Sequence, residues 1–172
     1  IQTYLDQLLA QTQGLSNGMR DFIWMLDPEK NSLYDLLIRL KEFGEQLFEH
    51  TGIDFRVSEV PEGYNSHELS LSFRRHLLLI VKEAFTNVLK HAQAKRVELI
   101  FEPEESSYRL KLVDNGVGFD TEKKGKGYGL KNMRERCKAL GGSCEWVSIK
   151  GKGTTLTLNI PWEDQGAHEE GG

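Results

Sequence analysis

The fold of this chain is decided by residues 81–91, which read VKEAFTNVLKH. Four of the polar residues in this stretch fall on one face of a helix: Glu83, Asn87, Lys90 and His91. A carboxylate, an amide, an amine and an imidazole in one row suit a metal–phosphate site, because oxygen ligands hold Mg²⁺ and cationic or donor groups hold phosphate oxygens. Taken alone, such a row is more typical of an ordinary solvated helix face.

A second segment, residues 114–120 (DNGVGFD), stands where a predicted strand ends. Gly116 and Gly118 would let the backbone approach a ligand closely. The carboxylate of Asp114, buried at the strand end, could accept a hydrogen bond from an exocyclic amine. Because Asp-Asn-Gly also favours turns, a simple turn stays an alternative interpretation.

A third segment, residues 125–130 (GKGYGL), opens directly into a predicted helix. Alternating glycines in front of a helix offer unpaired N–H groups and the positive end of the helix dipole to a phosphate. The spacing matches neither a P-loop nor a dinucleotide-binding fingerprint. A flexible lid or linker is the alternative.

The order of these segments is more specific than any one of them. An E-x-x-x-N-x-x-K-H helix, then D-x-G-x-G-F, then G-x-G-L, then G-T resembles the GHKL ATPase superfamily, to which histidine kinases, Hsp90, gyrase-type topoisomerases and MutL belong. Residues 83–92 and 129–136 look like sensor histidine kinases of the NarL/DesK-like branch. Residues 22–28 are similar to the end of that branch's dimerisation helix, particularly in hybrid kinases with periplasmic propeller sensors. The resemblance covers about Met19 to Trp162.

This resemblance implies ATP and Mg²⁺ as cofactors and a role for each motif residue. Asn87 would hold Mg²⁺ that bridges the phosphates, and Glu83 would polarise the attacking group or a metal-bound water. Lys90 and His91 would face the phosphates.

The glycine-containing motifs would supply the rest of the nucleotide site. Asp114 would bind the adenine amino group, with Thr154 helping through water. The remaining nucleotide-binding residues would shape the pocket floor and the ATP lid: Gly116, Gly118, Phe119, Gly127, Gly129 and Leu130. Closure of such a lid excludes water from the phosphates.

The N-terminal stretch up to Leu26 repeats apolar residues at alternating spacings of four and three, which is the a/d pattern of a coiled coil or helix bundle. Packing on the chain's own domain is the alternative to an intermolecular seam. Asp27-Pro28 ends the predicted helix. We therefore predict three parts: 1–27 as the second helix of a dimerisation bundle, 28–162 as a GHKL ATP-binding domain, and 163–172 as a disordered tail.

Hydrophobic periodicity predicts helices over 32–50, 70–92 and 130–140, and strands over 53–57, 96–101, 108–113, 143–149 and 154–160. The expected fold class is α+β, a two-layer α/β sandwich. In it, a mixed sheet of about five strands has helices on one face and follows a long dimerisation helix.

Composition excludes several classes of protein. The chain has 172 residues, 38% hydrophobic and 28% charged, which is typical of a globular domain. A net charge of −4 argues against nucleic-acid partners. Apolar runs such as Leu77 to Val81 are too short to span a bilayer. The two cysteines, Cys137 and Cys144, are predicted to be reduced structural thiols of a cytosolic protein.

None of the five histidines has the sequence context of a phosphoacceptor. The resemblance implies that this is the ATP-binding catalytic domain, from the cytoplasmic portion of a membrane-associated sensor kinase. It would pass the γ-phosphate to a His outside this chain and then to an Asp of a response-regulator receiver domain, in a parent that dimerises through the N-terminal helix. Two alternatives are another GHKL ATPase, such as an anti-sigma-type serine kinase, and a non-enzymatic nucleotide-binding regulatory module.

Overall fold

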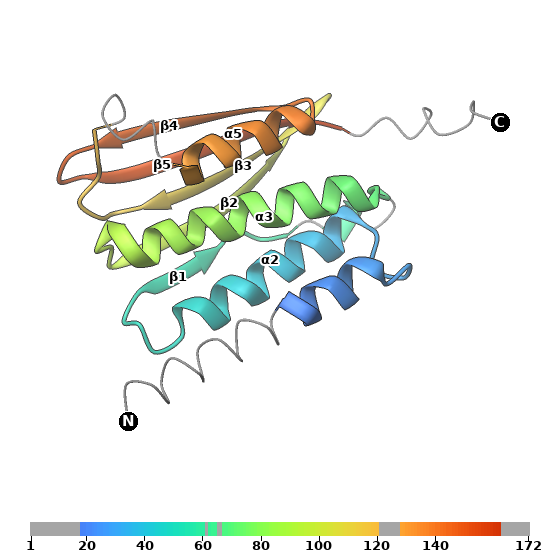
Figure 1. Cartoon of the computed structure of the whole chain (residues 1–172), viewed down its shortest axis with the longest axis horizontal. Coiled ribbons are helices and arrows are strands. Elements are labelled where there is room, and N and C mark those ends of the chain that lie inside the picture. Colours follow the sequence, from blue (N-terminus) through green and yellow to red (C-terminus); the bar gives the residue numbers. More distant parts are fainter. Residues whose placement is uncertain (1–17, 61, 65–66, 121–127, 163–172) are drawn as a thin grey trace.

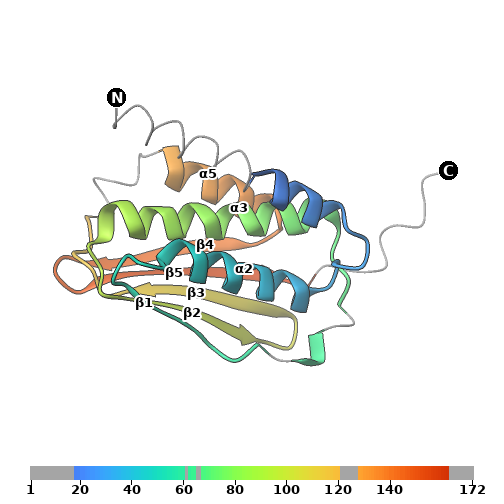
Figure 2. The same ribbon diagram turned by 90° about the horizontal axis from the view of Figure 1, so that it is seen from below.

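A computed structural model of the chain describes residues 18–60, 62–64, 67–120 and 128–162. Helices α2 (Leu33–Phe48), α3 (Leu71–Asn87) and α5 (Tyr128–Ala139) lie on one face of a five-stranded sheet, as Figure 1 and Figure 2 show. A helical segment at 18–26 lies against α2 and α3 on the side away from the sheet (Figure 2). The expected two-layer α+β sandwich is confirmed.

The sheet is mixed, with strand order β1-β2-β3-β5-β4. Its strands are β1 (Asp54–Val57), β2 (Arg96–Pro103), β3 (Ser107–Asp114), β4 (Ser143–Ile149) and β5 (Gly153–Pro161). Strand β1 pairs with β2 in parallel, and the other three pairings are antiparallel. A parallel pair needs a long crossover, and here a short 3₁₀ turn (Glu62–Tyr64) and α3 provide it.

Alternation along the strands sets which face is covered. In β2, Val97, Leu99 and Phe101 point toward the helices and are buried. The opposite face carries polar contacts, for example Lys111 Nζ to Glu102 at 2.8 Å. Because successive strand residues point to opposite faces, this pattern fixes one apolar and one polar face.

Helix α2 begins at a capping box. The Ser32 hydroxyl accepts a hydrogen bond from the Asp35 N–H at 3.1 Å, and the Asp35 carboxylate accepts from the Ser32 N–H at 3.3 Å. This pair satisfies two backbone donors that a helix start leaves unpaired. The apolar face of the helix, including Leu36 and Leu40, is then fully buried.

Helix α3 differs from its prediction in its last turn. The α-helix ends at Asn87, and a π-helical turn, η2 (Val88–Ala92), follows before Gln93 adopts a left-handed conformation at φ 51°. The helix predicted over 70–92 thus extends to its predicted end, but its last turn is π-helical. The wider π turn changes the direction of the side chains after Asn87.

The N-terminal prediction can be compared only over 18–26, because residues 1–17 lie outside the described part of the chain. This segment is helical, as predicted. Trp24 and Met25 pack on the core. The heptad residues of the segment are 54–66% exposed: Met19, Phe22 and Leu26. The face of this helix that packs on the domain is thus different from the face that carries the heptad residues.

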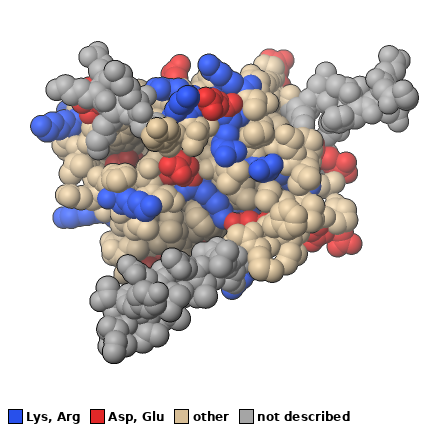
Figure 3. All heavy atoms as spheres, in the orientation of Figure 1, with Lys and Arg blue, Asp and Glu red and all other residues tan. Residues whose placement is uncertain are grey.

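The predicted tail 163–172 and residues 121–127, with Gly127, also lie outside the described residues. Among the described helices none is both long and apolar enough to span a membrane. Figure 3 shows Lys and Arg interspersed with Asp and Glu over one face of the molecule.

Candidate functional site

A cavity of about 590 Å³ opens between α3, η2, α5 and the strands β3, β4 and β5. Its volume lies within the range of small-molecule sites. Ten of the predicted site residues line it: Glu83, Asn87, Lys90, His91, Asp114, Gly118, Phe119, Gly129, Leu130 and Thr154. Residues from four separate motifs are thereby brought together around one space.

Glu83 and Asn87 lie one turn apart near the end of α3, where both are half-buried. The first turn of α5 approaches them closely at Gly129. A Cβ atom there would press against the Glu83 carboxylate and stand 3.7 Å from the Asn87 amide nitrogen. Glycine at this position therefore lets the α5 backbone lie directly against the polar pair.

Lys90 and His91 belong to the π turn and are exposed. Both still line the cavity, so the four polar residues of the helix motif do meet at one site. They reach it from the π turn that continues α3.

Asp114 lies at the end of β3 and is only 7% exposed. Its carboxylate accepts the backbone N–H of Gly116 at 2.8 Å and that of Thr154. Burial raises the pKa of this carboxyl group, and the two backbone donors oppose the rise. A buried acceptor at the wall of a pocket is suited to recognise a hydrogen-bond donor on a ligand.

Backbone atoms of other segments pack closely against the loop after Asp114. A Cβ at Gly116 would clash with the carbonyl oxygen of Ala92, and Gly118 has φ +64° beside the Ile149 carbonyl. Gly116 does not line the cavity, but it packs behind the floor that Asp114 forms. Both positions require glycine, as the motif predicted, for close approach and for backbone conformation.

A short hydrogen-bond chain fixes the next wall. The Phe119 N–H donates to the Ser148 hydroxyl at 2.7 Å, and the Ser148 and Thr154 hydroxyls are 2.9 Å apart. Thr154 faces Asp114 in the β3–β5 register. The pairing of these strands therefore brings the G-T motif to the carboxylate.

The apolar walls were missed by sequence reasoning. They include Leu112, Leu156, Met133 and Trp146. Trp146 contacts Arg134, whose guanidinium lies 4.9 Å from its ring centroid, and it also lines the cavity. Strand alternation was the sequence signal that could have found it. Trp146 stands two residues after Cys144, so both lie on the helix-facing side of β4.

The oxygen-bearing side chains of the cavity decide which metal ion it could hold. Within the described ranges no group of three or more His, Cys, Asp and Glu side chains could hold a metal ion. Glu83 and Asn87 offer two oxygen donors on one cavity wall. Mg²⁺ is commonly held by one or two protein oxygens together with substrate phosphates and water, so these residues fit Mg²⁺ bound with a phosphate ligand.

These features together define a class of protein. The buried carboxylate and apolar walls suit a flat heterocycle with a donor group, and the polar pair with the exposed Lys90 and His91 suits phosphates. A mixed sheet covered by helices on one face, with such a cavity, is the arrangement expected of a two-layer ATPase domain.

The comparisons with known proteins identify the family. The model of the histidine kinase-, DNA gyrase B-, and HSP90-like ATPases matches residues 73–164, and the chain belongs to that family. It is similar to the sensor histidine kinase LiaS of Bacillus subtilis, with 39% identity over 104 residues. It is also 36% identical over 129 residues to the histidine-protein kinase/phosphatase DegS of Brevibacillus brevis.

A solved structure shares the fold. The histidine kinase domain of the blue-light activated kinase of Erythrobacter litoralis has a TM-score of 0.62 and 21% identity, covering 74% of this chain and 61% of that one. The two sequence matches cover 59% and 73% of this chain. The chain itself spans only 29% of LiaS and 32% of DegS.

Proposed function

We propose that this chain is the ATP-binding catalytic part of a two-component sensor histidine kinase. The observation that carries the proposal is the convergence of Glu83, Asn87 and Asp114 on one cavity in a chain whose relatives are sensor histidine kinases. The buried carboxylate and the polar pair lie in separate motifs, and both are needed to bind the two ends of ATP.

Asp114 binds the adenine amino group, and Thr154 supports it through water. Its burial supports this role, because a charge-assisted hydrogen bond is strongest where water is excluded. Gly118, Phe119 and Leu130 enclose the base, and Gly116 holds the Asp114 loop. Gly127 and Gly129 belong to the lid over the phosphates.

Asn87 would hold Mg²⁺, and Glu83 would polarise the attacking group or a metal-bound water. Bound Mg²⁺ supplies neutralisation of the phosphate charge. Lys90 and His91 contact phosphate oxygens from the mouth of the cavity, where their exposure leaves them free to follow the ligand. Positioning and charge neutralisation account for most of the catalysis of phosphoryl transfer, so this set suffices for the ATP half of the reaction.

The parent protein passes the γ-phosphate to a His outside this chain and then to an Asp of a response-regulator receiver domain. The N-terminal helix contributes to a homodimer, in which its exposed heptad residues lie at the helix bundle. The chain belongs to the cytoplasmic portion of a membrane-bound sensor, with 28–162 as the ATP-binding domain and 1–27 as part of the bundle.

Calorimetric titration with Mg²⁺-ATP, ADP and GTP tests the proposal. We expect Asn87→Ala to abolish Mg²⁺-dependent ATP binding, whereas the control Asn159→Ala, on the polar face of the sheet beside Arg109, leaves it unchanged. Unchanged affinity in Asn87→Ala would exclude the metal role. Phosphoryl transfer to a separately supplied dimerisation helix that carries a His distinguishes a kinase from a nucleotide-binding regulatory module.

A further inference from the structure

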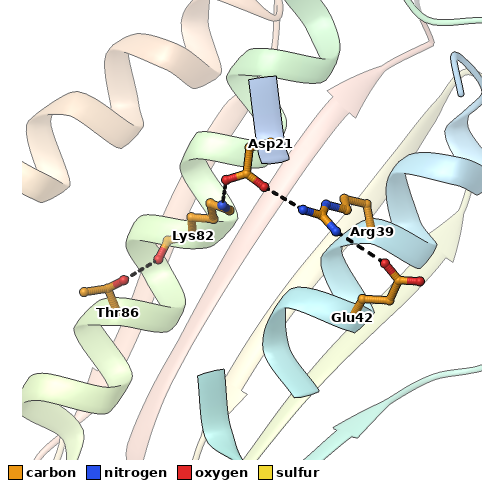
Figure 4. Close-up of polar contacts among 5 residues, drawn as sticks. All are labelled: Asp21, Arg39, Glu42, Lys82 and Thr86. Atoms are coloured by element: carbon orange, nitrogen blue, oxygen red, sulfur yellow. Dashed lines mark hydrogen bonds and ion pairs between the residues drawn. The ribbon is translucent and has the colours of Figure 1, made fainter. Parts of the chain in front are cut away.

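A cluster of partly buried charges joins the N-terminal helix to the ATP-binding domain. Asp21, from segment 18–26, lies between Arg39 of α2 and Lys82 of α3, and Figure 4 shows its two carboxylate oxygens directed at the two cations. The Arg39 guanidinium is 2.9 Å from one oxygen, and the Lys82 ammonium donates to the other. One carboxylate thus bridges three helices.

The cluster is shielded from solvent. The side chains of Asp21, Lys82 and Arg39 are 13%, 17% and 18% exposed. Lys82 also lies over the ring of Phe43, with 4.2 Å from its nitrogen to the ring centroid. Glu42 gives Arg39 a second, more exposed partner at 3.5 Å. Removing the Asp21 charge would leave Lys82 without a carboxylate partner among the described residues, which is costly for a partly buried cation.

A second anchor stands two turns earlier on the same helix. Arg74 is buried, lies over the Trp24 ring at 5.9 Å and donates to the Lys30 carbonyl oxygen at 2.8 Å. Arg74 and Lys82 are eight residues apart, so they share one face of α3. Segment 18–26 is therefore held along α3 at two points.

The same stretch of α3 forms a wall of the nucleotide cavity. Lys82 precedes Glu83, and its carbonyl oxygen accepts the Thr86 hydroxyl at 2.8 Å (Figure 4). Both Glu83 and Thr86 line the cavity. The helix that docks the N-terminal segment therefore also carries cavity-lining groups within about one turn of Lys82.

From this geometry we propose that docking of segment 18–26 through Asp21 and nucleotide binding in the cavity are positively coupled. Asp21 is a positioning residue: through Lys82 it restrains the turn of α3 that presents Glu83 and Thr86. A wall that is already ordered needs less further ordering when the ligand binds, so docking favours binding. Coupling is reciprocal, and bound nucleotide must stabilise the docked segment by the same factor. The inference rests on the proposed nucleotide site.

The experiment uses the whole chain and measures both directions of the coupling. Mg²⁺-ATP affinity is measured for Asp21→Asn, for the conservative Asp21→Glu and for the control Glu45→Gln, which removes a carboxylate from an exposed pair with Lys41. We expect Asp21→Asn to raise the Kd about fivefold or more, Asp21→Glu to restore much of the affinity, and Glu45→Gln to have no effect.

Hydrogen exchange measures the reverse direction on the unmutated chain, so a variant that fails to fold does not remove the test. Saturating Mg²⁺-ATP should slow exchange of the amides in 18–26, and this effect should vanish in folded Asp21→Asn. Equal affinity in folded Asp21→Asn, or exchange at 18–26 that does not respond to nucleotide in the unmutated chain, would overturn the coupling alone. Absence of any ATP binding to the unmutated chain would overturn the nucleotide site and, with it, the coupling.

Discussion

Substitution of Asp114 by Asn tests the adenine site with little change of shape. The carboxylate is 7% exposed and accepts the N–H groups of Gly116 and Thr154. Asn keeps one oxygen acceptor but replaces the other oxygen with an NH₂ group, which would meet the adenine amino group donor to donor. The perturbation is therefore confined to one hydrogen-bonding position.

The expected magnitude follows from that lost contact. A hydrogen bond to a charged group contributes about 1.5–3 kcal/mol. At about 1.36 kcal/mol per tenfold change, Asp114→Asn should weaken Mg²⁺-ATP binding by about 10- to 150-fold. Guanine carries an oxygen acceptor where adenine carries the amino group. The substitution should therefore raise the affinity for GTP relative to that for ATP.

The assay is calorimetric titration of ATP and GTP into both proteins. Asp54→Asn serves as the control, because Asp54 lies on β1 in exposed pairs with Arg56 and Arg96 and is absent from the cavity lining. ATP affinity that is the same in Asp114→Asn and in the unmutated protein would refute the reasoning. Equal binding of ATP and GTP by the unmutated protein would refute it as well.

Two further predictions concern stability and thiol chemistry. Phe85→Ala should lower the free energy of unfolding by about 3–5 kcal/mol in urea titrations, because the ring is fully buried among three other phenylalanine rings; the exposed Phe22→Ala should change it by under about 0.5 kcal/mol. Iodoacetamide should alkylate Cys144 before Cys137 in the native protein. A hydrogen bond from the Cys137 thiol, with help from Arg134, lowers the pKa of Cys144, whereas that same contact and burial raise the pKa of Cys137. Equal labelling by mass spectrometry would contradict this assignment.

The elements themselves could be predicted from the sequence because their signals are local. Alternation predicted β4 over its observed range, and the Ser32–Asp35 pair marks where α2 begins. The polar row from Glu83 to His91 was also recognisable from spacing and residue type. Such signals act between residues a few positions apart, which is why one sequence suffices to detect them.

The end of α3 could not be predicted from the same signals. Residues 88–92 continue the helical pattern, yet they form a π turn that ends at Gln93. The Ala92 carbonyl in that turn accepts the Val117 N–H at 2.7 Å. The bond joins the turn to the loop after β3, so it is a tertiary contact without a local sequence signature.

By itself, the sequence determined the helices, the strands, the family motifs and the polar residues of the site. The tertiary structure alone decided that Thr154 faces Asp114, that Trp146 forms a cavity wall and that Asp21 bridges Arg39 and Lys82. The physical reason is range. Propensity, capping and periodicity act along the chain, whereas strand register and helix packing join segments far apart in sequence and depend on how the whole core is filled.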